Sequence, residues 1–263
     1  MEDSKRKEGR GFLPTVKAGG IHRANLMNFE KFLEHICCEV ANLFLQLKNI
    51  FIDEPPKINP ADNEFVAFAK TRRIKFLVHF TKIDNLPSIA EQGLLTRKNL
   101  DKMSAKYFYN DSTRRDNIKN SLSLSVTFPN YKMFFKYRVH SKNWAVILLD
   151  AEKIFANLPC AFHAANASCN SERYRKLQER MTLDAFKRMF DENDRKGRNL
   201  RDNETTDPQA EIICLADIPL EYFAGIIFED SARLNDNKQL FPNIPCRVDK
   251  SYFEPRHDWN YGK

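Results

Sequence analysis

The sequence predicts an α+β fold built on a mostly antiparallel β-sheet, and three observations favour it. Short apolar runs typical of strands recur along the chain, but they do not alternate with helices in the regular order of a parallel sheet. The chain has 263 residues, enough for one large domain with an extension. Hydrophobic residues make up 42% of it, so the chain can bury a sizeable core.

The N-terminal part is expected to be an extension, residues 1–63, followed by the main domain, residues 64–263. Apolar residues recur at three- and four-residue steps over residues 28–50, which predicts one amphipathic helix with a packing face. A segment with three prolines then indicates a linker to the main domain.

The main domain is organised around residues 74–95. This stretch begins as an apolar strand, turns, and continues as a short helix that Gly93 closes, because glycine adopts a positive φ without steric cost. Three polar residues cluster where the strand runs into the helix, at His79, Thr81 and Asn85. A small polar ligand usually meets a fold of this kind at such a place.

The later elements are less regular. Apolar runs predict further strands over residues 121–126, 144–149, 209–215 and 223–228. Residues 133–138 fit either a helix or a bent strand, and a helix is expected over residues 171–190 with Arg180 on its outer side. Residues 97–120 are expected to form a surface loop with room for one helical turn, and residues 152–170 and 191–208 are expected to be irregular. The tail from 230 shows little apolar patterning before Ile244. A loop as long as 191–208 is usually functional or disordered.

Composition and motifs exclude several function classes. None of the six cysteines forms a Cys-x-x-Cys pair, so no metal site is expected and reduced thiols of a cytoplasmic protein explain them. Neither a signal peptide nor a membrane span is visible, which predicts a soluble protein with no membrane partner. Gly-x-Gly-x-x-Gly, P-loop and Gly-x-Ser-x-Gly motifs are absent, which weighs against dinucleotide dehydrogenases, Walker-type NTPases and α/β-hydrolases.

Two polar residues in apolar strands allow alternative interpretations. His79 is either a hydrogen-bonded core residue, the commoner case, or a functional group. Glu211 leads directly into an apolar strand, where burial of a carboxylate is costly unless it is paired or used. A strand-end glutamate that simply faces water is the equally weighted alternative for Glu211.

Three segments together resemble the DarT family of toxin ADP-ribosyltransferases. They read VHFTKIDNLPSIAEQGLL, SVTFPNYKMFFKYR and PQAEIICLADIPLEYF, and they span roughly Phe76 to Glu229. The resemblance implies two small, packed sheets around a cleft that holds NAD as substrate. It implies Glu211 as the catalytic glutamate. The implied NAD contacts are His79, Thr81, Asn85, Ser125 and Tyr131. The catalytic arginine is placed by position only, at Arg114 or Arg115, of which Arg115 is preferred.

The chemistry that the resemblance implies suits these residue types. Cleavage of the nicotinamide–ribose bond passes through an oxocarbenium-like transition state in which the ribose hydroxyls become more acidic. A glutamate that binds the 2′-hydroxyl then holds it more strongly than in the ground state, which is the condition for catalysis.

Nucleic acid is the expected acceptor. Basic and aromatic side chains alternate in residues 102–119, a pattern suited to stacking splayed bases and holding phosphates, although an ordinary solvated face is the alternative. A base must be unstacked to be modified, which favours a single strand. The predicted nucleic-acid contacts are Lys106, Tyr107, Tyr109, Arg114 and Lys132. The net charge of +7 agrees with such a partner.

The sequence therefore predicts an NAD-dependent ADP-ribosyltransferase that modifies a base of single-stranded DNA or RNA. It would act as the toxin of a bacterial toxin–antitoxin or phage-defence system, with a cognate antitoxin. Residues 128–134 differ from the Tyr-Val-Pro-Phe-Tyr-Phe run of the thymidine-modifying branch, so thymine, guanine and an RNA base all stay open as acceptors. The alternatives are a protein ADP-ribosyltransferase or NAD glycohydrolase, and a non-catalytic RNA-binding module.

Overall fold

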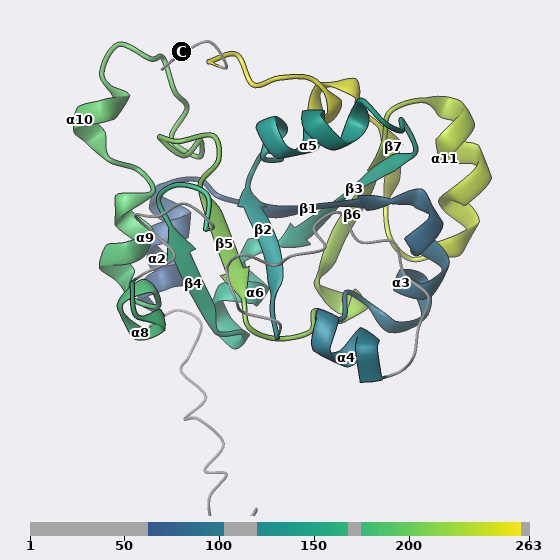
Figure 1. The fold of residues 1–263 in the computed structure, drawn as a ribbon, viewed down its shortest axis with the longest axis horizontal. Coiled ribbons are helices and arrows are strands. Elements are labelled where there is room, and N and C mark those ends of the chain that lie inside the picture. Colours follow the sequence, from purple (N-terminus) through teal and green to yellow (C-terminus); the bar gives the residue numbers. More distant parts are fainter. Residues whose placement is uncertain (1–62, 103–119, 168–174, 259–263) are drawn as a thin grey trace, which may run out of the picture. The chain divides into compact units, whose positions relative to one another are not determined.

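The computed structural model describes residues 63–102, 120–167 and 175–258, all within a compact unit of residues 58–263. Its centre is a seven-stranded sheet in the order β4-β5-β2-β1-β3-β6-β7, with β1 crossing the middle (Figure 1). The strands are β1 (Phe76–Lys82), β2 (Leu122–Val126), β3 (Trp144–Asp150), β4 (Cys160–His163), β5 (Glu211–Cys214), β6 (Phe223–Phe228) and β7 (Cys246–Val248).

Strand pairing is antiparallel everywhere in this sheet except between β6 and β7. All seven residues of β1 pair with β3, whereas the described pairing of β1 with β2 is confined to Leu77 and Val78. The sheet therefore splits between β1 and β2 beyond Val78. The predicted α+β fold with a split, mostly antiparallel sheet is confirmed.

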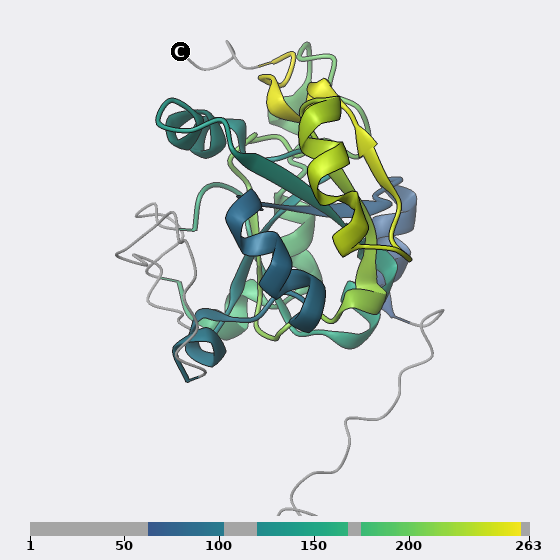
Figure 2. The same cartoon turned by 90° about the vertical axis from the view of Figure 1, so that its right-hand side faces the viewer.

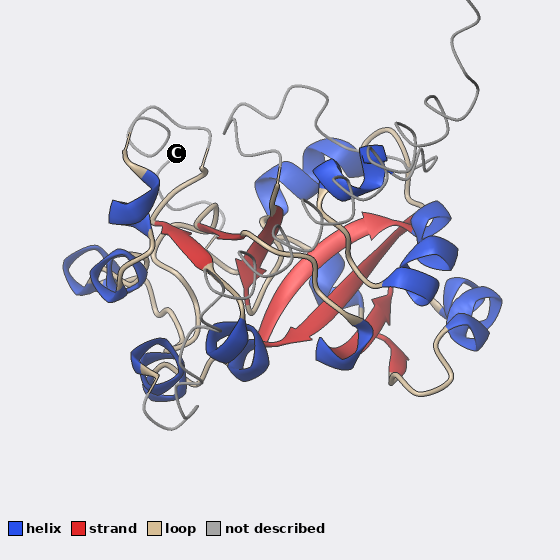
Figure 3. Ribbon diagram, turned by 90° about the horizontal axis from the view of Figure 1, so that it is seen from below, coloured by secondary structure: helices blue, strands red, loops and turns tan. Residues whose placement is uncertain are grey.

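Helices cover both faces of the sheet (Figure 3). The α-helices are α2 (Glu64–Thr71), α3 (Leu86–Gln92), α4 (Arg97–Lys102), α5 (Tyr131–Arg138), α6 (Ala151–Asn157), α8 (Leu177–Arg180), α9 (Leu183–Arg188), α10 (Glu192–Arg195) and α11 (Ser231–Asn237). The 3₁₀ helices are η2 (Ile83–Asn85), η3 (Leu220–Tyr222), η4 (Lys238–Leu240) and η5 (Lys250–Phe253). Helix α11 packs beside β6 and β7 (Figure 2). None of the helices in the described ranges has the length and apolar character needed to cross a membrane.

The two faces of the sheet bury separate apolar clusters because side chains alternate along each strand. Leu77 belongs to the larger cluster, which packs against α2, α3, α6 and α9. Val78 belongs to a second cluster, which packs against α5 and η5. Phenylalanine rings in the larger cluster pack against one another; for example, Phe162 of β4 stacks on Phe186 of α9 with ring centroids 4.4 Å apart. This alternation assigns each strand residue to one face of the sheet. The face in turn determines which polar side chains of neighbouring strands can contact each other.

Residues 152–170 were expected to be irregular, and for their described part this prediction is wrong. Most of helix α6 lies there, and Asp150 caps the helix because its Oδ1 accepts a hydrogen bond from the backbone N–H of Lys153. Strand β4 follows and pairs with β5. All four residues of β4 are buried, so the strand shows no alternation of polar and apolar residues by which it could be recognised.

The helix expected over residues 171–190 is also corrected for its described part, residues 175–190. Two short helices, α8 and α9, replace it, because Thr182 breaks the run and caps α9 by accepting a hydrogen bond from the backbone N–H of Ala185. Arg180 is 5% exposed, so it is buried and does not decorate the outer side.

The C-terminal tail is more ordered than its apolar pattern indicates. It contains α11, η4, β7 and η5. Asp230 caps α11 through the backbone N–H of Arg233, and Asp249 caps η5 through that of Ser251. Residues 133–138, for which the sequence allowed two interpretations, form most of helix α5. The predicted helix over residues 28–50 lies outside the described residues.

Gly93 ends α3 with φ 76° and ψ −164°, a backbone conformation essentially restricted to glycine. A Cβ atom at this position would lie 2.5 Å from the carbonyl oxygen of Ile218, whose own N–H and C=O pair with Leu94. The close approach of the two backbones therefore requires glycine.

We expect Gly93→Ala to lower the free energy of unfolding by about 1–3 kcal/mol, measured by urea denaturation. Gly197→Ala is the matched control, because Gly197 has the same φ of 76° but a Cβ atom there would meet no other atom within 4 Å. Equal losses in the two variants would contradict the role assigned to the contact with Ile218.

Candidate functional site

Glu211 is the first residue of β5 and is buried, with 8% of its surface exposed. Its Oε2 accepts a hydrogen bond of 3.1 Å from the backbone N–H of Ala167. Directly across the strand pair lies His163, the fully buried last residue of β4. The alternative that Glu211 simply faces water is therefore wrong, and the carboxylate is held in a fixed, shielded position.

Ser125 of β2 lies on the other side of Glu211. Leu124 pairs with Ile212, so the next register position sets Ser125 opposite Glu211 on the same face of the sheet. Ser125 is buried, and its Oγ accepts a hydrogen bond of 3.0 Å from the backbone N–H of Asn130. His163, Glu211 and Ser125 thus form a row across three adjacent strands, which we call the Glu211 row.

A second group of predicted residues lies on β1 and η2. The Nδ1 atom of His79 is 3.0 Å from the carbonyl oxygen of Ser123 on β2. A carbonyl oxygen only accepts, so Nδ1 carries the proton in this hydrogen bond. Thr81 follows on the same face of β1, and its Oγ1 accepts a hydrogen bond of 3.1 Å from Asn85. The structure thus brings Thr81 and Asn85 into direct contact.

The two groups lie on opposite faces of the sheet, and His79 contacts the backbone of β2, the strand that carries Ser125. His79 occupies the face of β1 that carries Leu77, whereas Glu211 occupies the face of β5 that carries Ile213. The His79 ring reaches across the split to Ser123, which is two residues before Ser125. Buried and half-buried polar side chains of β1 and β2 therefore line the split in the sheet.

Tyr131 begins α5 and is buried beside the C-terminal tail. Burial raises the pKa of its phenol, and the negative charge of Asp258 raises it further. The phenol is therefore protonated at neutral pH, and its hydroxyl can donate a hydrogen bond. Lys132, the next residue, is exposed on the same helix.

A buried ionic cluster ties the tail to the segment that precedes β5, and we call it the tail cluster. Asp258 accepts hydrogen bonds from Arg256 at 2.6 Å through both Nε and Nη2, and from Nη2 of Arg198 at 2.8 Å. The Nη1 of Arg256 is also 3.5 Å from the hydroxyl of Thr205. The three ionic side chains are at most 6% exposed. This cluster fixes residues 191–208, a segment expected to be an irregular loop.

The two arginines of the tail cluster lower the pKa of the Asp258 carboxyl. Burial raises the pKa of this carboxyl, but hydrogen bonds and charges from Arg256 and Arg198 outweigh burial. The pKa therefore lies below its ordinary value, and Asp258 is ionised at neutral pH.

Five predicted site residues lie outside the described residues, within 103–119. They are Lys106, Tyr107, Tyr109, Arg114 and Arg115. Sequence reasoning did not predict the tail cluster, and it did not predict that His163 lies across the strand pair from Glu211. The only signal for His163 was a polar residue closing a short apolar run, and that signal is too weak to identify a strand.

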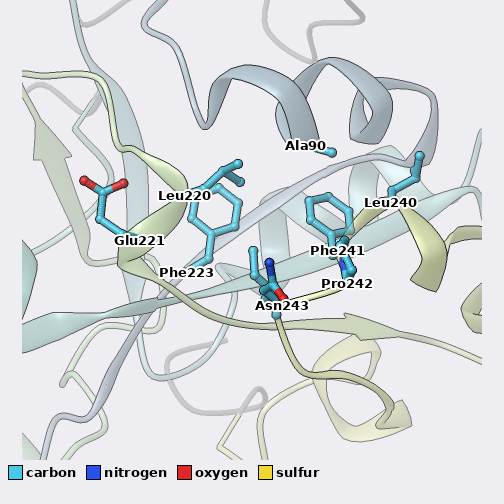
Figure 4. A pocket seen from close by; sticks show the side chains of 9 residues that line it. Ala90, Leu220, Glu221, Phe223, Leu240, Phe241, Pro242 and Asn243 are labelled. Carbon is cyan, nitrogen blue, oxygen red and sulfur yellow. The ribbon is translucent and has the colours of Figure 1, made fainter.

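An apolar pocket of about 410 Å³ lies elsewhere in the fold, between α3, η3, β6 and η4 (Figure 4). Its lining includes Leu220, Phe223 and Phe241, together with the exposed Glu221. It contains none of the predicted site residues. The candidate site is therefore the polar split in the sheet, and the pocket is separate from it.

Comparison with protein families matches residues 78–261 to a family described as ssDNA thymidine ADP-ribosyltransferase, DarT. The match covers most of the chain and includes the Glu211 row, the polar residues of β1 and the tail cluster. The resemblance predicted from the sequence motifs is thereby confirmed. Comparison with curated protein sequences gives no match.

Solved structures share the fold at low sequence identity. Thermus sp. 2.9 DarT in complex with ADP-ribosylated ssDNA aligns with a TM-score of 0.51 and 15% identity, over 68% of this chain and 96% of that one. The same protein in complex with NAD+ gives a TM-score of 0.46 and 17% identity over 68% and 96%. Thermosipho africanus DarTG in complex with ADP-ribose gives 0.49 and 19%, over 68% of this chain. This chain spans 51%, about half, of the Thermosipho chain.

Proposed function

We propose that this chain, which belongs to the DarT family of ssDNA thymidine ADP-ribosyltransferases, transfers ADP-ribose from NAD to a thymine base of single-stranded DNA. The observation that carries the proposal is the buried carboxylate of Glu211, fixed by a backbone N–H and by its place in the Glu211 row. A buried carboxylate is costly to maintain unless it is paired or used.

The residues at the split fit NAD as the substrate. Hydroxyl, amide and imidazole groups of Ser125, Thr81, Asn85 and His79 supply donors and acceptors for ribose and nicotinamide groups. Tyr131 adds a protonated phenol. NAD supplies the bond to be broken, between nicotinamide and ribose. Glu211 accepts a hydrogen bond from the ribose 2′-hydroxyl, and this bond strengthens as positive charge develops on the sugar.

The acceptor follows from the family description, which names thymidine in ssDNA. Single-strandedness suits the chemistry because a base must leave its stack to be modified. We keep Arg115 as the catalytic arginine, and we assign Arg114 and Lys132 to contacts with the acceptor strand. Residues 128–134 depart from the run of the thymidine-modifying branch, so guanine and RNA are tested as competing acceptors.

The biological role that we assign is that of a toxin acting on DNA in the bacterial cytoplasm, where both NAD and single-stranded DNA are available. Bulky adducts on template bases would block copying of DNA. A cell that makes such an enzyme needs a means of control, so we assign it a cognate antitoxin. We assign the enzyme and its antitoxin to a toxin–antitoxin system or to a phage-defence system.

The test is incubation of the purified full chain with NAD labelled on the adenylate phosphate and a set of 20-nucleotide oligonucleotides. Four single-stranded DNAs each lack one base, and a duplex DNA and a matching RNA complete the set. We expect label in every single-stranded DNA except the one without thymine. Label should survive protease and disappear with nuclease.

Other outcomes would overturn parts of the proposal in distinct ways. Loss of label only from the DNA without guanine would replace thymine by guanine. Label on the RNA alone would make RNA the acceptor. Label on protein would indicate a protein ADP-ribosyltransferase, and nicotinamide release without labelled product would indicate a glycohydrolase. NAD left intact would leave a non-catalytic nucleic-acid-binding module.

A further inference from the structure

Helix α5 presents two large apolar side chains to solvent on its outer side. Phe135 is 53% exposed and Val139, directly after the helix, is 72% exposed. They are four residues apart and so lie on the same side of the helix. Lys132 and Lys136 are exposed beside them. We call these four residues the α5 platform.

The opposite side of α5 fixes the platform to the sheet. Phe134 is buried and stacks on Phe80 of β1 with ring centroids 4.6 Å apart. Arg138, at the end of the helix, donates a hydrogen bond of 2.5 Å from Nη2 to Glu229. Asn130 caps the helix start through the backbone N–H of Met133 at 3.2 Å. Phe135 is therefore an exposed ring on a helix whose backbone is fixed to the sheet.

The exposed charged side chains on α5 and just after it are lysines. Residues 117–149 include neither aspartate nor glutamate. Lys142 is exposed just after Val139, in addition to the two lysines of the platform. The charge of Arg138 is balanced by Glu229, at 13% and 23% side-chain exposure respectively. The surface thus combines an exposed aromatic ring with three exposed lysines, which complements a polyanion with flat, stackable bases.

The platform is also connected to the candidate site. Helix α5 begins at Tyr131, and the residue before it donates its backbone N–H to Ser125 in the Glu211 row. An eight-residue helix is about 12 Å long, so Phe135 lies about one turn beyond Tyr131. Helix α5 therefore starts next to the Glu211 row, and a strand with its base at that row would extend by about one helical turn to reach Phe135.

We propose that the α5 platform binds the single-stranded nucleic acid next to the acceptor base, with one base stacked on Phe135 and backbone phosphates at Lys132 and Lys136. The proposal rests on the proposed function, because it takes the acceptor strand as the occupant. An apolar protein partner fits less well, since three exposed lysines border two apolar side chains on this surface. Base stacking on an aromatic ring tolerates any sequence, so the platform supplies affinity and not choice of base.

The test compares variants of the full chain for binding of a fluorescein-labelled 20-nucleotide ssDNA by fluorescence anisotropy at fixed salt, without NAD. We expect Phe135→Ala to raise Kd by about 5- to 150-fold, because stacking of one base is lost. Phe135→Trp should keep the wild-type affinity for ssDNA, because it retains an aromatic ring. Phe135→Leu should bind ssDNA more weakly than the wild type. Val248→Ala, which truncates an exposed valine on β7, is the control for a general surface effect.

The lysines give an independent readout. Lys132→Gln together with Lys136→Gln should weaken binding and lower the slope of log Kd against log salt by about 1.4, since each phosphate contact to a single strand contributes about 0.7. A Kd for Phe135→Ala within twofold of the wild type would overturn the proposal. So would weaker self-association of Phe135→Ala with unchanged ssDNA binding, which would assign the platform to a second copy of the chain.

Failure of the platform and failure of the proposed function are distinguishable. For the transfer reaction we expect Phe135→Ala to raise KM for the oligonucleotide and to leave kcat unchanged, because the platform does not touch the reacting atoms. A wild-type chain that binds ssDNA in a Phe135-dependent way but transfers no label would retain the platform and reject the transferase. If Phe135→Ala transfers ADP-ribose as efficiently as the wild type, the platform is rejected and the transferase is retained.

Discussion

Glu211→Gln is expected to lower kcat for ADP-ribose transfer by about 10²- to 10³-fold, corresponding to about 2.7–4 kcal/mol of transition-state stabilisation. Glutamine keeps the size of the side chain and can still accept the hydrogen bond from Ala167, but it removes the negative charge. The charge matters most when the sugar becomes cationic, so kcat falls more than the affinity for NAD. The measurement is single-turnover transfer of label to a thymine-containing ssDNA at saturating NAD.

The matched control is Glu221→Gln, which removes an exposed carboxylate at the separate apolar pocket. Its kcat should stay within twofold of the wild type. NAD binding by Glu211→Gln, followed by calorimetry, should change by less than tenfold. A Glu211→Gln variant that retains full transfer activity would remove the carboxylate from the mechanism. Lost activity accompanied by a lower unfolding temperature would indicate a structural role instead.

The sequence predicted the parts of the fold whose signal is local. The stretch from β1 to α3 shows a strand, a turn, a helix and a closing glycine in consecutive residues, and the φ of 76° at Gly93 agrees with this prediction. Glu211 could be selected because a carboxylate in front of an apolar run is unusual. Its environment could not be predicted, since Ala167 and His163 reach it through strand pairing between β4 and β5.

Elements without a local pattern could not be recognised from the sequence. Strand β4 is buried throughout, so nothing alternates along it. Helix α5 is aromatic on both sides, and tertiary packing of Phe134 decides its conformation and leaves Phe135 exposed. The tail cluster joins Arg198 to Asp258 across 60 positions of sequence. Such a contact leaves no periodicity in a single sequence, so its residues look like ordinary charges of irregular segments.

Asp258→Ala is expected to destabilise the protein by about 3–5 kcal/mol, the cost of leaving a buried charge without its partner. Asp258 binds two guanidinium groups, those of Arg198 and Arg256, and the three side chains are almost inaccessible to water. At roughly 2–4 °C per kcal/mol for a chain of this size, the unfolding temperature should fall by about 6–20 °C. Differential scanning calorimetry at pH 7 measures the change.

The destabilisation should depend on pH in a defined direction. The folded-state pKa of Asp258 lies below its value in the unfolded chain, so its contribution is complete above the unfolded pKa of about 3.9. As the pH falls below that value toward the folded-state pKa, the wild type loses this contribution. The difference between the wild type and Asp258→Ala should therefore be constant from pH 7 to about 5 and shrink below about pH 4.

Glu152→Ala separates a buried ionic contact from an exposed one. Glu152 pairs with Lys70 at 2.8 Å, but their side chains are 51% and 58% exposed, so its loss should cost at most about 1 kcal/mol. Equal losses for Glu152→Ala and Asp258→Ala would refute the role of burial. If Asp258→Ala is less stable and also transfers more slowly at 20 °C while still folded, the tail cluster positions residues 191–208 and Tyr131 for the reaction. If it is less stable but fully active below its unfolding temperature, the cluster stabilises the fold without shaping the site.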